Sequence, residues 1–64
     1  MNQQAFEAGK SAYKQGNLVE ALAQLSSAKG PGEVSGTIDH LRGNCLMRVG
    51  RYAEAAQAYA DALG

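Results

Sequence analysis

Two stretches of this 64-residue chain decide its fold: residues 13–22, YKQGNLVEAL, and residues 47–56, MRVGRYAEAA. A shift of 34 residues lays the first stretch on the second and aligns the rest of the chain in the same frame. Six of the thirty aligned pairs are identical, where a chain of this Ala- and Gly-rich composition gives about two or three by chance. The identical pairs are Gly9 and Gly43, Gly16 and Gly50, Glu20 and Glu54, Ala21 and Ala55, Ala28 and Ala62, and Gly30 and Gly64. A period of this length is typical of stacked helix–turn–helix units.

The order of small and large residues in each copy resembles the tetratricopeptide repeat, a pair of antiparallel helices that stacks into a superhelix. The first copy carries Ala8-Gly9, residues 13–22, Leu25 and Ala28, and the second carries Arg42-Gly43, residues 48–55, Tyr59 and Ala62. The chain departs from the family pattern at Ala5 and Asp39, where a bulky aromatic residue is common, and at Pro31, which precedes the usual proline position. The resemblance covers nearly the whole chain. It implies an all-α fold of two tandem hairpins in a single domain 1–64, an α-solenoid fragment with repeat 1 at about 2–34 and repeat 2 at about 35–64.

The periodicity of apolar residues and the breakers between them predict four helices. In the second helix of the first copy, Leu18, Leu22 and Leu25 recur at helical spacing. Gly16 and Gly50 each follow a helical stretch, at the point where a helix commonly ends in the left-handed conformation. We expect helices at about residues 2–15, 18–29, 35–49 and 52–63.

Small residues mark where the two helices of each hairpin are expected to touch. Gly9 and Ala21 in the first copy match Gly43 and Ala55 in the second. The distance between packed helices follows the size of the side chains at the contact. We therefore expect close packing at these four positions.

The connector between the copies is the breaker-rich stretch 29–37, KGPGEVSGT. Gly30 is expected to cap the preceding helix, Pro31 to prevent its extension, and Ser35 or Thr37 to cap the next helix. A phosphate-binding glycine loop is excluded, because no strand precedes these glycines and no Gly-Lys-Ser/Thr follows them.

Composition and charge narrow the classes of partner. Six Lys and Arg balance six Asp and Glu, so the formal net charge is zero, whereas nucleic-acid-binding proteins usually carry a marked basic excess. The chain has no apolar run of about 18 residues, as a membrane-spanning helix needs, and no leader-like N-terminus. Its one cysteine, Cys45, suits a reducing compartment. We therefore predict a cytoplasmic protein whose partners are neither nucleic acids nor membranes.

The sequence offers no set of residues suited to catalysis. A nucleophile needs an adjacent base, and the only candidates, His40 and Cys45, lie about 140° apart around a helix. Cys45 is expected to fill a small, partly buried position, and His40 to face solvent or a groove. With no second His and no Cys pair, no metal site is predicted, and no carboxylate pair is placed for acid–base chemistry. We expect no enzyme activity, no cofactor and no metal.

The family resemblance implies a binding surface instead. In tetratricopeptide repeats, the first helix of each repeat lines a concave groove that binds peptides. We refer to the matching residues as the groove set: Phe6, Lys10, Tyr13 and Lys14 in the first copy, and His40, Asn44, Met47 and Arg48 in the second. Lys10 and Lys14 are four residues apart, as are Asn44 and Arg48, so each pair lies along one helix face. The groove set predicts a locally basic surface and a protein or peptide partner, with acidic peptides favoured.

Other interpretations of the same residues remain open. The groove set fits the solvated faces of two amphipathic helices equally well. A carboxylate clamp, found in a subgroup of the family, is not assigned. Asn44 stands at the expected place, but Lys10 and Phe6 occupy the positions of the first copy's asparagine and lysine, and a third repeat is missing.

A structural or assembly role is the alternative function. Stacked repeats generally need about three copies for independent stability, and no C-terminal capping helix follows Leu63 in this sequence. We therefore expect a fragment of a longer repeat protein or a homo-oligomer, most simply a two-fold dimer. The expected contact is the apolar face of the last helix, formed by Tyr52, Ala56, Tyr59 and Leu63.

Overall fold

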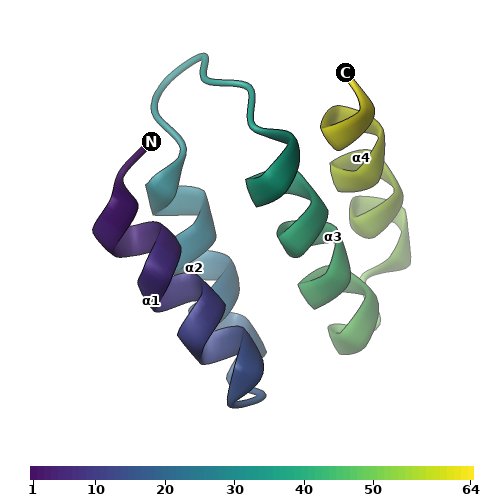
Figure 1. The fold of residues 1–64 in the computed structure, drawn as a ribbon. Coiled ribbons are helices and arrows are strands. Elements are labelled where there is room, and N and C mark those ends of the chain that lie inside the picture. The colour runs from purple at the N-terminus through teal and green to yellow at the C-terminus, as the bar shows by residue number, and fades with distance from the viewer.

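The computed structural model describes residues 1–64 and consists of four α-helices joined by two tight turns and one connector. The helices are α1 (Gln3–Lys14), α2 (Leu18–Ala28), α3 (Gly36–Val49) and α4 (Tyr52–Leu63). Helices α1 and α2 form one hairpin, α3 and α4 form a second, and α2 packs against α3 between them (Figure 1). The predicted all-α fold of two tandem hairpins is confirmed, and each predicted helix boundary is correct to within one residue.

The two hairpin turns use the same hydrogen bonds, one repeat length apart. Gly16 has φ +80° and donates its N–H to Tyr13 O at 3.1 Å, while Gly50 has φ +87° and donates to Met47 O at 3.2 Å. The next residue in each turn donates back to the carbonyl five positions earlier, at 2.9 Å in both cases. A left-handed conformation favours glycine, because it lacks the Cβ that would clash there. The predicted turn role of both glycines is therefore confirmed.

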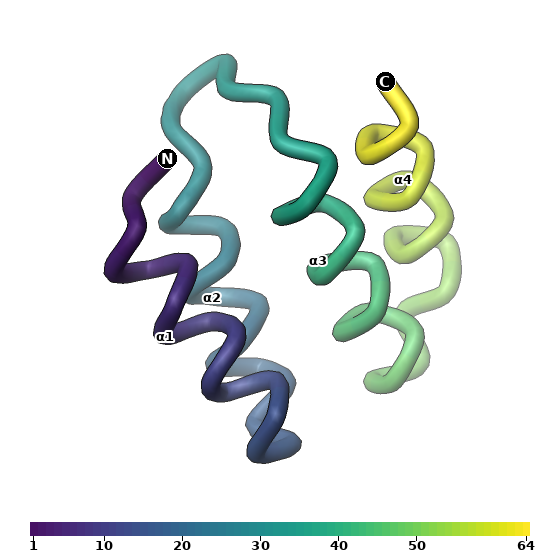
Figure 2. Tube along the Cα trace, viewed as in Figure 1, coloured from purple at the N-terminus to yellow at the C-terminus, as the bar shows by residue number.

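The connector differs in one detail from the prediction. Lys29, the residue that follows the last residue of α2, has an extended backbone. Gly30 does not adopt the left-handed conformation expected of a cap, and Gly32 adopts it instead. Pro31 provides the reason, since the residue before a proline is pushed towards extended backbone. Gly30 donates its N–H to Glu33 Oε1 at 3.0 Å instead. The continuous path of this segment from α2 to α3 is visible in Figure 2.

Ser35 caps the first turn of α3, which confirms one of the two predicted caps, Ser35 and Thr37. The Oγ of Ser35 accepts the N–H of Ile38 at 3.3 Å. In α1 the same role belongs to Asn2, whose Oδ1 accepts the N–H of Ala5 at 3.1 Å. Each cap satisfies one of the N–H groups that have no partner within the helix.

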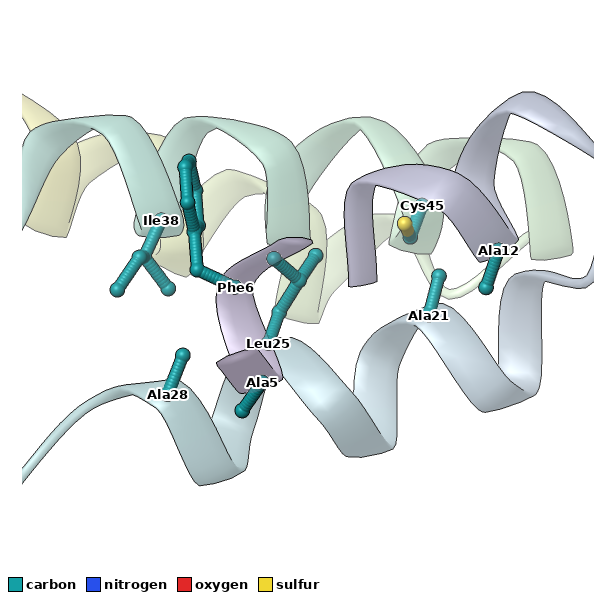
Figure 3. Packing of buried hydrophobic residues seen from close by; sticks show 8 residues of the cluster. All are labelled: Ala5, Phe6, Ala12, Ala21, Leu25, Ala28, Ile38 and Cys45. Carbon is teal, nitrogen blue, oxygen red and sulfur yellow. The ribbon is translucent and has the colours of Figure 1, made fainter. Parts of the chain in front are cut away.

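The main core lies between the first hairpin and α3. Phe6, Leu25 and Ile38 gather towards one end of it, with Cys45, Ala12 and Ala21 at the other (Figure 3). A smaller cluster of Leu46, Ala55 and Ala58 holds α3 to α4. Burial of apolar side chains is the main favourable contribution to folding, so α3 is the helix that joins both hairpins into one body.

Glycines on the first helix of each hairpin allow the second helix to approach closely. A Cβ added at Gly9 would lie 2.8 Å from Leu25 Cδ2, and one added at Gly43 would lie 2.6 Å from Tyr59 Cε1. Ala21 and Ala55 are fully buried. The close packing predicted from these four small residues is confirmed.

A buried ion pair links the connector to α3. Asp39 has a fully buried side chain, and its Oδ1 accepts from Lys29 Nζ at 3.0 Å and from Arg42 Nη1 at 3.2 Å. A buried carboxylate is costly unless paired, and these two cations provide the pairing. The sequence pattern marked Asp39 only as a departure from an aromatic position, without this network.

Candidate functional site

The groove set divides between two helices, with four residues on α1 and four on α3. Lys14, His40, Met47 and Arg48 are exposed, while Lys10, Tyr13 and Asn44 are half-buried. Met47 is the most exposed apolar member, at 45%. Seven of the eight predicted residues therefore reach the surface.

Phe6 is the exception, because it belongs to the core. Its side chain is only 8% exposed and lies in the cluster with Leu25 and Ile38 (Figure 3). The second hairpin provides this cover through Ile38 on α3. Phe6 therefore supports the surface from beneath, with Lys10 Nζ lying 5.0 Å above the centre of its ring.

The structure brings one residue of each repeat together. The guanidinium carbon of Arg48 on α3 lies 5.4 Å from the centre of the Tyr13 ring on α1. A cation over an aromatic face is attracted by the negative charge of the ring face. This contact makes the exposed sides of α1 and α3 continuous at Tyr13 and Arg48.

His40 and Asn44 both contact Tyr59 on α4. The His40 ring lies 5.6 Å from the Tyr59 ring at an interplanar angle of 55°. The Tyr59 hydroxyl donates a hydrogen bond of 2.6 Å to Asn44 Oδ1. Tyr59 was predicted only as part of the apolar face of α4, so its contact with the groove set was missed. The positions of His40 and Asn44 on either side of Gly43, where the second helix packs closely, are the signal from which this contact could have been predicted.

The charges on this surface are mostly positive. Lys10, Lys14 and Arg48 are cations, and the one acidic group in contact with them is Glu7, whose Oε1 accepts from Lys10 Nζ at 3.4 Å. Lys14 and Arg48 make no ion pair within the chain. The formal net charge of the chain is zero, yet this surface carries two cations, Lys14 and Arg48, that form no ion pair within the chain.

Two shallow cavities lie away from the groove set. One, of about 180 Å³, is lined by α3 and α4 residues that include Arg42, Leu46 and Asp61. The other, of about 280 Å³, lies beside Lys29, Asp39 and Asp61. Neither is lined by a groove-set residue, so the predicted surface is an open face rather than a pocket.

Cys45 and His40 lie in different surroundings. Cys45 is fully buried in the core, and this burial raises the pKa of its thiol. A thiol is much less nucleophilic than a thiolate, so burial holds Cys45 in its unreactive form. His40 lies on the surface against Tyr59.

Comparison with protein-family models, curated proteins and solved structures finds no match for this chain. The tetratricopeptide resemblance therefore stays a prediction, carried by the 34-residue repeat and the matching turns. No helix in the structure is both long and apolar enough to cross a bilayer.

Proposed function

We propose that this chain is a tetratricopeptide-like interaction module that binds an acidic peptide or protein segment along the exposed sides of α1 and α3 that meet at Tyr13 and Arg48. The proposal rests chiefly on the contact of Arg48 with Tyr13, which joins the two helices into one surface. Lys10 and Lys14 add positive charge on the α1 side. A partner of opposite charge is steered to such a surface and held by hydrogen bonds that the charges strengthen. A reducing cytoplasm fits the single cysteine and is proposed with it.

The test is an NMR titration of the ¹⁵N-labelled chain with acetyl-hexaaspartate amide. Lys10, Asn44 and Arg48 amide signals are expected to move, whereas acetyl-hexaasparagine amide should leave them in place. Because the contact is electrostatic and exposed, the affinity should fall as salt is added.

A matched pair of variants distinguishes binding at this surface from an unspecific effect of the chain's net charge. Arg48→Gln and Arg51→Gln each remove one exposed cation, but Arg51 lies at the start of α4 and pairs with Glu54. Only Arg48→Gln should weaken binding of the aspartate peptide. Equal loss in both variants, or no binding by the wild-type chain, would refute the proposed function.

A second candidate, self-assembly, is supported by the outer face of α4. Tyr52 is 64% exposed and Leu63 is 92% exposed. One repeat earlier, Leu18 and Leu22 occupy the positions of Tyr52 and Ala56, and both pack against the core. Within these 64 residues nothing covers the corresponding face of the second hairpin.

A two-fold arrangement fits this face better than head-to-tail stacking. The residues of α3 that pack towards the first hairpin include Ile38, Leu41 and Cys45. Their counterparts on α1 are Gln4, Glu7 and Ser11, which are polar and exposed. The outer face of α1 therefore suits solvent, and the favoured contact joins two copies of α4.

Sedimentation between about 5 and 500 µM tests self-assembly, since a dimer gains stability with concentration. Leu63→Lys should abolish association. Val19→Lys, which changes an exposed apolar residue of α2 (78%) in the same way, should not. A folded monomer throughout the range would refute the second candidate.

A further inference from the structure

Tyr59 lies across α3 at the position of Gly43. The missing side chain at Gly43 makes room for its ring, because a Cβ there would be within 2.9 Å of three ring carbons. His40 contacts the same ring one turn earlier on α3. The ring is therefore held close to α3, and its hydroxyl reaches Asn44.

The hydrogen bond from Tyr59 fixes which end of the Asn44 carboxamide faces outward. The amide oxygen, Oδ1, accepts the hydroxyl at 2.6 Å. The amide nitrogen, Nδ2, makes no hydrogen bond within the chain and is not among the buried unpaired atoms, so it is open to solvent. An Asn side chain carries its acceptor and its two donors on opposite sides of one planar group. With Oδ1 turned towards Tyr59, the two N–H donors are the part of the carboxamide that is left without a partner in the chain.

We propose that Tyr59 is a positioning residue, whose hydroxyl holds the Asn44 carboxamide with its N–H donors directed to a ligand on the α1–α3 surface. This inference rests on the proposed function and deepens it. Arg48 follows Asn44 by one helical turn and makes no ion pair, and its guanidinium lies over Tyr13. Both side chains therefore offer donors on one helix face, which selects a ligand rich in acceptors, such as a carboxylate-bearing peptide.

The first repeat lacks this arrangement. Leu25 stands in the place of Tyr59 and has no hydroxyl, and Lys10 stands in the place of Asn44. Lys10 is positioned by Glu7 and Phe6 instead. The two repeats thus present different donors, an ammonium group paired with Glu7 and an amide held by Tyr59.

The test compares Tyr59→Phe with Tyr52→Phe. The first removes the hydroxyl and keeps the ring that packs on Gly43, while the second removes an exposed hydroxyl that makes no hydrogen bond within the chain. In the free protein, the Asn44 side-chain amide signals should shift and exchange faster with water in Tyr59→Phe only. Circular dichroism checks that both variants fold.

Binding of acetyl-hexaaspartate amide provides the second measurement. Tyr59→Phe should raise Kd about three- to tenfold, the range expected for one hydrogen bond, and Tyr52→Phe should leave it unchanged. Asn44→Ala should weaken binding at least as much. Adding Tyr59→Phe to Asn44→Ala should then cause no further loss, because the hydroxyl acts only through the amide.

The outcomes distinguish the inference from the proposed function. If the aspartate peptide fails to bind the wild-type chain, both are overturned. If it binds and Tyr59→Phe leaves Kd and the Asn44 amide signals unchanged, the positioning role alone is overturned. Additive losses in the double variant would also overturn it, since they would mean that Tyr59 acts independently of Asn44.

Discussion

Replacing Gly9 by Ala should destabilise the chain, although alanine is the better helix former. Gly9 lies inside α1, where the change favours the helix by about 1 kcal/mol. The new methyl group, however, would lie 2.8 Å from both Cδ2 and Cγ of Leu25 and 3.3 Å from its backbone nitrogen. Leu25 is fully buried, so it has no open space to move into.

The two effects oppose each other, and packing should prevail. Overpacking of a tight core costs about 1–3 kcal/mol, and the middle of this range exceeds the gain of about 1 kcal/mol in helix propensity. The free energy of unfolding should therefore fall by about 1 kcal/mol, which lowers Tm by about 4–8 °C in a domain of this size. Gly43→Ala should have a smaller effect, because Tyr59 is half-buried whereas Leu25 is fully buried, so a shift of the Tyr59 ring towards solvent can relieve part of the strain.

Thermal and urea unfolding followed by circular dichroism measure the difference. Ser11→Ala is the control, since Ser11 lies on the exposed side of the same helix, where an added methyl group meets no new packing and only an exposed hydrogen bond from Gln15 Nε2 is lost. Ser11→Ala should raise Tm slightly. If Gly9→Ala raises Tm as well, Gly9 does not lie at the helix contact and the packing of the first hairpin is wrong.

Three other outcomes follow from the buried and titrating groups. Asp39→Asn should lower the free energy of unfolding by about 1–3 kcal/mol. This is less than the loss on breaking a fully buried ion pair, because both cationic partners of Asp39 reach solvent. An unchanged urea midpoint would contradict this. A hydrogen bond from the N-terminal amine, then one from Gly30, lowers the pKa of Glu33, so its stabilising effect is present above the ordinary pKa and is lost as the pH falls through the lowered one. The difference in free energy of unfolding between wild type and Glu33→Gln should accordingly shrink on acidification. A difference that stays constant from pH 7 to 3 would exclude the ion pair between the N-terminal amine and Glu33. Burial of Cys45 should protect its thiol from a chromogenic disulfide reagent in the folded chain and expose it in urea; rapid labelling without urea would show that the core opens there.

The helices and their turns were predictable because local patterns determine them. Gly16 and Gly50 each end a helix through their own freedom to adopt positive φ, and Ser35 caps α3 through a bond to a residue three positions away. Gly30 shows the limit of such reasoning. Its neighbour Pro31 favours extended backbone over the cap conformation that a glycine after a helix would otherwise adopt.

The candidate site was less predictable because neighbours distant in sequence decide which side chains are exposed. Phe6 and His40 are equivalent in the repeat, yet the first is buried and the second exposed. Residues of α3 cover Phe6, and no later helix within these 64 residues covers His40 in the same way. Burial here depends on the place of a repeat in the stack as much as on the residue itself.

The same reasoning explains why the two repeats differ chemically on one surface. At the position of Leu25 burial favours an apolar residue, because a polar side chain removed from water there would need a partner. The equivalent Tyr59 keeps one side open, so its hydroxyl can reach the surface and bond Asn44 there. The least covered hairpin is therefore the one free to carry polar groups between its helices. Under the proposed function, recognition should depend more on the second hairpin, because Tyr59 holds Asn44 there and Arg48 makes no ion pair. In the first hairpin the equivalent Lys10 is paired with Glu7, and only Lys14 is exposed without an ion pair.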